Sequence, residues 1–588
     1  MRRTALAMSL AVVVALAASG CGRDGGPGRD GVDPDSGLGT SMFDDAATRV
    51  VNPSDTAGGT LRLVASENWD SLDPGNTYRV FAWNFGRLLG RTLVAYRGTP
   101  GAAGLELTPD LATSLGKVSD GGRTVTYTLR AGVTYEDGTP VRAADVKYAI
   151  ERSNYAPEVL GNGPAYFRQL LGDGYTGPYA QPADRGGLAA ITTPDDATIT
   201  FHLTRPFAEF DHLATLPETI PVPAAKDTGA GYAAHPLSTG PYMVDRYDPG
   251  HLLRLVPNPH WDAAADPLRR RLPDVVEVTP ALEPTEVDER LLSGAADLDI
   301  GGTGLGAAGQ ARVQSNPNLR KNVDNPQTGW TSFLALNTRA EPLRDVHCRR
   351  AVLLAADHDA LQAAYGGTSG GDLATTLLPP TVAGHRSADR YGFLTARGGD
   401  VAAAKQELKA CGRPDGFRTG LAVRSDRPKE MAAAGALKVS LERVGIRVDP
   451  QPFPSEKYFT DYAGDPTYVE GHDIGLSFMA WAADWPTGYA FLAQLVSSDA
   501  IRAERNSNLS QLRDPEVDRL LRDGRGDPDP AARAQTWGDV DARVLETAAV
   551  LPIVYERVLS YRGPELTNVW LHPAYGMYDV SALGVMRP

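Results

Sequence analysis

Strand patterns and helix patterns alternate in the second half of the chain, and this alternation leaves few folds open. Residues 421–423 form an apolar strand pattern, residues 431–444 carry apolar side chains at helical spacing, and residues 446–448 return to a strand pattern. A strand, a crossing helix and a second strand pack as a parallel pair covered by the helix. This region is therefore predicted to be an α/β lobe.

The first half of the chain is richer in short strands. Residues 125–129 and 197–203 alternate with the period of a strand, and apolar positions within 146–150 follow helical spacing. These patterns predict a mixed lobe. A chain of 588 residues is too long for a single core, so we expect two or three lobes.

The N-terminus predicts export. Two arginines precede the apolar run Ala5–Ala18, which is too short to span a membrane. Small residues then lead into Cys21, which resembles the bacterial lipoprotein box, in which the cysteine becomes the lipidated N-terminus. Residues 1–20 are thus expected to be a signal peptide; a plain signal ending near a cysteine is the alternative. Attachment of more than one acyl chain, such as palmitate, anchors a soluble body stably to a membrane.

Residues 21–56 are mostly Gly, Asp, Pro and Ser and are expected to form a lipidated flexible tether. Once Cys21 is set aside, Cys348 and Cys411 remain as an even pair on an exported protein. A disulfide between them is favoured, and two buried free thiols are the alternative.

Charge and motif content exclude several functions. The net charge is -14 and Arg269–Arg271 is the one basic run, which argues against a nucleic-acid partner. The sequence lacks H-E-x-x-H, a Walker motif and a cysteine placed as a nucleophile, and its ten histidines lack metal-ligand spacing. We therefore expect no catalytic residues, metal or cofactor; a secreted hydrolase remains the enzyme alternative.

One glycine motif has two interpretations. Gly304, Gly306 and Gly309 satisfy G-x-G-x-x-G after a short apolar strand at 298–300. A dinucleotide site would also need a second strand ending in an acidic residue, and no convincing one follows. A glycine-rich turn between a strand and a helix, near the passage between lobes, is favoured.

A single carboxylate stands out in the segment 478–492. Asp484 lies between Trp481 and Trp485, just after the apolar strand pattern 474–479. A carboxylate in an apolar aromatic setting is costly unless a cation meets it. A ligand site and a solvated loop aspartate beside two core tryptophans are both compatible with these residues alone.

Several runs, in order along the chain, resemble the family 5 (peptide/nickel-type) solute-binding proteins of ABC importers. They span about Gly58 to Tyr561 and include residues 59–63 (GTLRL), 71–74 (SLDP), 127–146 (YTLRAGVTYEDGTPVRAADV), 238–242 (STGPY), 334–337 (LALN), 444–448 (VGIRV) and 481–486 (WAADWP). The resemblance implies an α/β, two-lobed periplasmic-binding-protein-like fold of class II, with an extra subdomain in the first lobe. The implied boundaries are 57–325 for the first lobe, 326–545 for the second, and 546–588 for a return to the first.

The resemblance also implies a function: an extracytoplasmic lipoprotein, monomeric and not an enzyme, that captures peptides between its lobes and delivers them to a permease and ATPase. Asp484 matches the aspartate that pairs with a peptide's α-ammonium. Ala480, Trp481, Ala482 and Trp485 would line the site, and Tyr555 matches a lining position approximately. The fold also hosts binders of oligosaccharides and other small solutes. Trp69, Trp83, Trp330 and Trp481 could stack on sugar rings, with core packing as the alternative. A surface receptor without transport is a further alternative.

Overall fold

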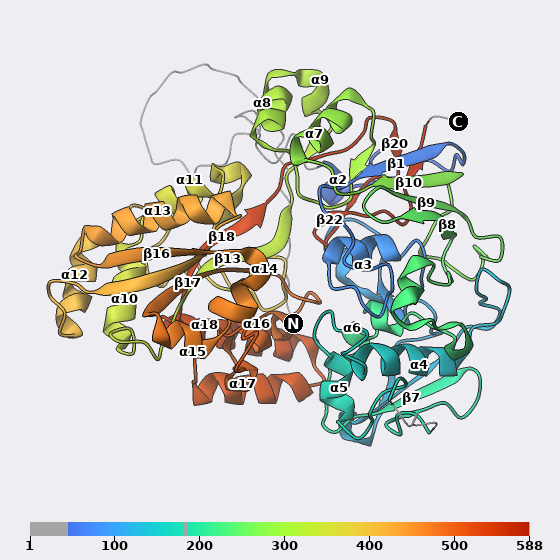
Figure 1. Cartoon of the computed structure of the whole chain (residues 1–588), viewed down its shortest axis with the longest axis horizontal. Helices are drawn as coiled ribbons and strands as arrows, with labels where there is room; N and C mark the ends of the chain where they lie inside the picture. Colours follow the sequence, from blue (N-terminus) through green and yellow to red (C-terminus); the bar gives the residue numbers. More distant parts are fainter. Residues whose placement is uncertain (1–44, 181–185, 587–588) are drawn as a thin grey trace, which may run out of the picture.

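The computed structural model describes residues 45–180 and 186–586 and shows two lobes side by side (Figure 1). The chain leaves the first lobe after β12 (Val323–Asp324) and returns at β19 (Ser560–Tyr561). These two short strands pair with each other, so the two crossings between the lobes run together. The predicted two-lobed α/β fold is confirmed.

The first lobe is built on a five-stranded sheet with the order β11-β1-β10-β9-β8. Its strands are β1 (Thr60–Val64), β8 (Tyr242–Asp248), β9 (Leu252–Pro257), β10 (Val275–Thr279) and β11 (Leu298–Asp299). The helices of this lobe include α3 (Val80–Gly86), α7 (Pro284–Ser293), α8 (Ala307–Ser315) and α9 (Pro317–Arg320). Trp69, Phe81 and Phe85 pack in the core of this lobe. Figure 1 shows α3 on the side of the lobe that faces the second lobe.

A subdomain is inserted between β1 and β8. Its four-stranded sheet has the order β4-β5-β7-β6, formed by β4 (Lys117–Ser119), β5 (Thr124–Thr128), β6 (Ile191–Thr192) and β7 (Thr198–His202). Three helices accompany it: α4 (Ala143–Asn154), α5 (Tyr166–Leu171) and α6 (Phe210–Leu213). Two residues of the second lobe, Trp485 and Ala490, belong to the hydrophobic core of this subdomain. The lobes therefore touch at a buried contact as well as at the crossings.

The second lobe has a six-stranded sheet with the order β14-β18-β13-β17-β15-β16. Its strands are β13 (Gln327–Leu336), β14 (Gly371–Leu373), β15 (Arg418–Arg424), β16 (Arg447–Phe453), β17 (Ile474–Trp481) and β18 (Val550–Arg557). β15 pairs in parallel with both β16 and β17, as strand–helix–strand alternation predicts.

Side chains on the two faces of this sheet pack into two separate hydrophobic cores. Leu334 and Leu336 pack with one set of helices, formed by α10 (Val346–Ala355), α11 (His358–Ala364), α12 (Val401–Ala410) and α13 (Pro428–Glu442). Phe333 and Ala335 pack with the opposite set, formed by α16 (Gly488–Val496), α17 (Pro515–Gly526) and α18 (Pro530–Glu546). None of the helices in the described ranges is both long and apolar enough to cross a membrane.

Two expected boundaries are wrong. The return to the first lobe does not begin at 546, because β18 pairs with β13 and β14 inside the second-lobe sheet as far as Arg557. The tether does not extend to 56, because α2 (Asp45–Thr48) packs on the first lobe with Ala46 fully buried, and Val51 bridges to Val569. Ala46 and Val51 hold this described part of the expected tether, from Asp45 onward, against the first lobe despite its polar composition.

The glycine motif is a turn, as favoured. β11 ends at Asp299, and the chain turns through Gly304, which has a φ of +73°, before α8 begins after Gly306. The Asp299 carboxylate accepts hydrogen bonds from the backbone N–H groups of Gly301 and Thr303. The acidic group thus stabilises the turn itself.

Candidate ligand-binding site between the lobes

One large cavity of about 1100 Å³ lies between the two lobes. From the first lobe it is lined by α3 with its preceding turn, by the glycine turn 301–306, and by residues 573–577 near the C-terminus. From the second lobe it is lined by the start of β13, by residues 424–430 and by the loop 480–486. A molecule held there would touch both lobes.

Asp484 occupies one end of this cavity, on the loop that follows β17. The hydroxyl of Tyr78 donates to its two carboxylate oxygens at 2.8 and 2.9 Å, and the hydroxyl of Tyr166 donates to Oδ2. Both tyrosines come from the first lobe, so Asp484 links the lobes. Burial raises the pKa of Asp484 to about 6, although the two hydroxyls oppose the shift. A carboxylate has about four acceptor positions, which leaves capacity for one more donor.

A second carboxyl group lies near Asp484. Glu218 follows Leu216 and Pro217, which line the cavity, and its buried Oε2 lacks a hydrogen-bond partner among the described residues. Burial raises the pKa of Glu218 to about 7, and the charge of Asp484 adds to the shift. Neither carboxyl group has a basic group at ion-pair distance among the described residues, so a cation bound beside Asp484 would stabilise their ionised forms.

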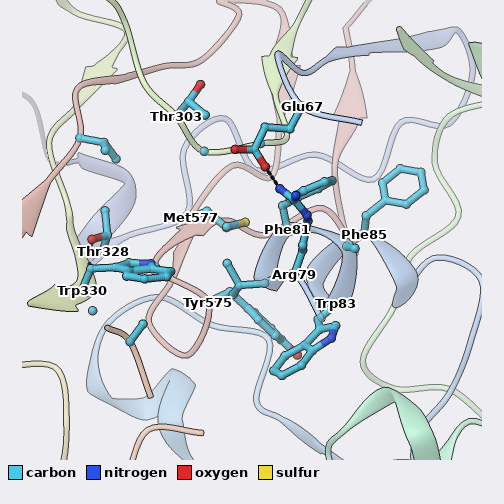
Figure 2. A pocket seen from close by; sticks show the side chains of 18 of the residues that line it. Glu67, Arg79, Phe81, Trp83, Phe85, Thr303, Thr328, Trp330, Tyr575 and Met577 are labelled. Carbon is cyan, nitrogen blue, oxygen red and sulfur yellow. Dashed lines mark hydrogen bonds and ion pairs between the residues drawn. The ribbon is translucent and has the colours of Figure 1, made fainter. Parts of the chain in front are cut away.

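Aromatic side chains form one wall of the cavity (Figure 2). Trp83 and Tyr575 come from the first lobe and Trp330 from the second, and all three rings are partly exposed. Phe81 and Phe85 lie behind them and are nearly buried. Arg79 and Glu67 form an ion pair at the rim. The aromatic wall suits apolar groups of a ligand.

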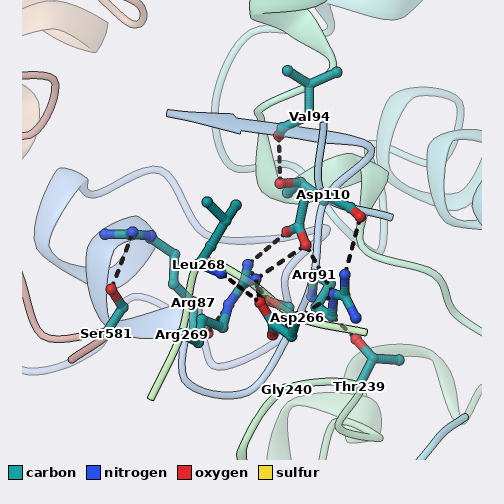
Figure 3. Close-up of polar contacts among 12 residues, drawn as sticks. Arg87, Arg91, Val94, Asp110, Thr239, Gly240, Asp266, Leu268, Arg269 and Ser581 are labelled. Carbon is teal, nitrogen blue, oxygen red and sulfur yellow. Dashed lines mark hydrogen bonds and ion pairs between the residues drawn. The ribbon is translucent and has the colours of Figure 1, made fainter. Parts of the chain in front are cut away.

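A buried ion-pair network fixes the chain that follows α3 (Figure 3). Arg269 donates to the Asp110 carboxylate at 2.6 and 3.1 Å and to the carbonyl oxygen of Arg87 at 2.7 Å. Arg91 donates to the same carboxylate at 2.8 Å, and Asp266 accepts from Arg269. Because every charge is paired, the network is a structural support for the wall.

Most basic groups at the cavity are also paired. Arg424 bonds to Glu430, and Arg557 bonds to Asp372. Within the described part of the chain, Arg427 and Lys429 line the cavity without a carboxylate at ion-pair distance. Both are exposed at the start of α13. These two are the candidates for meeting a negative group on a ligand, a partner that sequence patterns did not identify.

The structure brings most of the predicted site residues together. Ala480, Trp481, Ala482, Asp484 and Trp485 all line the cavity. Tyr555 does not: it lies buried on β18, where its hydroxyl contacts Thr376 Oγ1 at 2.8 Å, and its neighbour Glu556 lines the cavity instead. The predicted lining position is therefore wrong by one residue. Neighbouring residues of a strand point to opposite faces of the sheet, so Glu556 and not Tyr555 faces the cavity.

Two other predicted sites fall elsewhere. Cys348 and Cys411 form a disulfide that joins α10 to the end of α12, with Cα atoms 5.5 Å apart. Cys21 lies outside the described residues. No group of three potential metal ligands occurs within 45–180 and 186–586.

The four tryptophans considered for stacking all line the cavity, but they differ in exposure. Trp69 packs on Phe81 and Phe85 with ring centroids 5.2 and 4.8 Å away and is 8% exposed, so core packing describes it. Trp83, Trp330 and Trp481 are partly exposed.

The sequence did not predict that Tyr78, Tyr166 and Glu218 lie beside Asp484, because these residues are distant in the chain and only the fold brings them together.

Two α/β lobes joined by adjacent crossings, with one large cavity between them, define a two-lobed binding protein. The sequence pattern of the bacterial extracellular solute-binding proteins, family 5 (middle region) matches residues 106–502, and the chain belongs to this family. It is 26% identical to the probable D,D-dipeptide-binding periplasmic protein DdpA of Escherichia coli K12, over 86% of this chain and 90% of that protein.

Solved structures agree with this assignment. The clavulanic acid biosynthesis oligopeptide binding protein 2 superposes with a TM-score of 0.90 at 46% identity, covering 94% of this chain and 99% of the other. The Helicobacter pylori periplasmic binding protein DppA, solved in complex with the peptide STSA, gives a TM-score of 0.70 at 20% identity, covering 90% and 99%. The second likeness shows the fold alone.

Proposed function

We propose that this protein is the extracytoplasmic binding component of an ABC importer and that it captures peptides between its lobes. The observation that carries the proposal is Asp484: a carboxylate that lines the inter-lobe cavity close to a second carboxyl group, with no basic group at ion-pair distance among the described residues. A peptide's α-ammonium would supply the missing positive charge.

The rest of the cavity supports a peptide ligand. Partly exposed rings such as Trp83 and Trp330 would receive apolar side chains, and Arg427 or Lys429 would face the carboxylate end. The backbone at Ala480, near the end of β17, and at Ala482, just after it, lies at the cavity and would offer donors and acceptors that do not discriminate between side chains. Relatives whose names describe binding of peptides or dipeptides fit this ligand class.

The direct test is to identify what the protein binds. Native mass spectrometry of the mature protein, purified from its own host, is expected to show co-purified peptides. Calorimetry should then give saturable binding of a tripeptide or pentapeptide and no heat with a neutral oligosaccharide. Binding of the oligosaccharide alone would replace the peptide proposal with the sugar-binding alternative, in which Trp83, Trp330 and Trp481 would stack on the rings.

Membrane attachment through Cys21 is part of the same proposal and rests on the sequence. Lipidation would hold the lobes at the outer face of the membrane, within reach of a permease and its ATPase. Labelled palmitate should be incorporated into the wild-type protein and not into Cys21→Ala, which should appear in the medium or the soluble extracytoplasmic fraction. Membrane retention of the unlabelled variant would overturn the anchor.

A further inference from the structure

One buried carboxylate of the first lobe, that of Glu209, has its side-chain partners in the second lobe. Glu209 precedes α6 and is 1% exposed. The indole N–H of Trp485 and the hydroxyl of Thr487 donate to its Oε2 at 2.8 and 2.6 Å, and the indole N–H of Trp537 donates to Oε1 at 3.3 Å. Arg533 lies 3.6 Å from Oε1. All four partners come from the second lobe.

Apolar contacts surround this cluster, which we call the Glu209 contact and define as Glu209, Trp485, Thr487, Arg533 and Trp537. Phe207 lies against Trp485 and Tyr489 of the second lobe, with ring centroids 6.3 and 5.4 Å apart. The backbone N–H of Ala208 donates to the carbonyl oxygen of Arg525 at 2.8 Å. Figure 1 shows α5 and α6 beside α16 to α18 at this place. The lobes are thus also in contact through residues that lie far in sequence from the two crossings.

The Glu209 contact is continuous with the acidic end of the cavity. Trp485 directly follows Asp484 in the chain, and its ring packs against Tyr166 with centroids 5.1 Å apart. The hydroxyl of Tyr166 in turn donates to Asp484. Glu209 therefore holds the loop that carries Asp484, and the same loop places Trp485 against the tyrosine that orients the Asp484 carboxylate.

We propose that Glu209 is a positioning residue for the ligand site: it fixes the loop 484–487 against the first lobe, so that Asp484 reaches its binding geometry only when the lobes close. This inference rests on the proposed function and adds to it a residue outside the cavity lining. Opening the lobes would leave the Glu209 carboxylate and the indole N–H groups to water, so closure and assembly of the acidic end are one event.

The chain offers a matched control within α6, the short helix that Glu209 precedes. Asp211 is a partly buried carboxylate two residues from Glu209, but it accepts hydrogen bonds from Tyr127 and Gly116, both within the first lobe. Asp211→Asn changes a partly buried acid in α6 without altering a contact to the second lobe. Glu209→Gln keeps the shape of the side chain and one acceptor, and it guards against a loss of folding in Glu209→Ala.

The experiment compares a tripeptide with its N-acetylated form by calorimetry on the mature protein and these three variants. Wild-type protein should prefer the free peptide. Glu209→Ala should weaken binding of the free peptide at least about tenfold and reduce that preference, because donors left buried without a partner each cost affinity. Glu209→Gln should lie between, and Asp211→Asn should match wild type.

The outcomes separate the two proposals. If wild type binds no peptide, the proposed function fails. If wild type prefers the free peptide and folded Glu209→Ala and Glu209→Gln keep both the affinity and the preference, the positioning role of Glu209 is overturned. An equal loss in Asp211→Asn would also overturn it, because the effect would then belong to α6 and not to the contact between lobes.

Discussion

The Asp484 carboxyl should make ligand affinity depend on pH. Its pKa is raised to about 6 by burial, and a ligand ammonium pairs with the ionised form. Affinity should be highest near pH 7, fall by up to about tenfold per pH unit below about pH 6, and fall again above about pH 8, where the peptide's α-ammonium loses its proton. Glu218, with a pKa of about 7, feels the charge of Asp484 and should release part of its proton when a cation binds there. Tyr78 and Tyr166 stay protonated, since burial raises their pKa values.

Calorimetry between pH 5 and 8, in buffers of different ionisation enthalpy, would count these protons. An N-acetylated peptide lacks the ammonium and should show a much flatter profile. Equal affinity of the free peptide across this range would contradict the assignment of Asp484 as the group that pairs with the ligand.

Trp330 should contribute to side-chain preference. Its ring enters the cavity from the second lobe and is partly exposed there. Trp330→Ala should weaken binding of a phenylalanine-containing peptide by about 0.5–1.5 kcal/mol and leave an all-alanine peptide nearly unchanged. Trp570→Phe is the control, because Trp570 lies outside the cavity lining and its indole N–H has no hydrogen-bond partner among the described residues. The same loss for both peptides would mean that Trp330 shapes the cavity and does not contact side chains.

At the scale of the elements, the disulfide between α10 and the end of α12 should contribute to folding stability and not to peptide binding. Cys348 and Cys411 are separated by 63 positions. Loop-closure entropy predicts that Cys348→Ala with Cys411→Ala lowers the free energy of unfolding by roughly 4 kcal/mol. Denaturant titration would measure it, with peptide affinity as the control. An unchanged midpoint would show that the unfolded chain is not restrained by this bond.

Elements with a strong local pattern were predictable from the sequence. The strand at 474–479, the helix within 431–444 and the Asp345 cap of α10, which accepts from the N–H of His347, all follow from spacing and capping rules. The membership of β18 in the second-lobe sheet was not predictable, because an apolar strand does not reveal its partner. The Glu209 contact joins residues 276 and 278 positions apart, which no local pattern encodes.

The whole molecule should become more compact when it binds a peptide. The paired strands β12 and β19 connect the lobes. Arg562 and Tyr578 bond to Asp324 of β12 and stabilise this connection. We therefore expect the lobes to move as rigid bodies about the strand pair. Small-angle scattering should show a smaller radius of gyration with saturating peptide. Asp484→Ala should need a higher peptide concentration for the same change. Scattering curves that are identical with and without peptide would rule out closure as the response.

The central claim is that one enclosed carboxylate pairs with the positive end of the ligand. The most direct measurement is calorimetry of a free and an N-acetylated tripeptide with wild type and Asp484→Ala, at about pH 7, where most of the carboxyl is ionised and most of the peptide's α-ammonium keeps its proton. We predict that acetylation costs wild type at least about a hundredfold in affinity, since one partner of a buried pair is lost, and that Asp484→Ala binds both peptides equally weakly. Equal binding of both peptides by wild type would contradict the account.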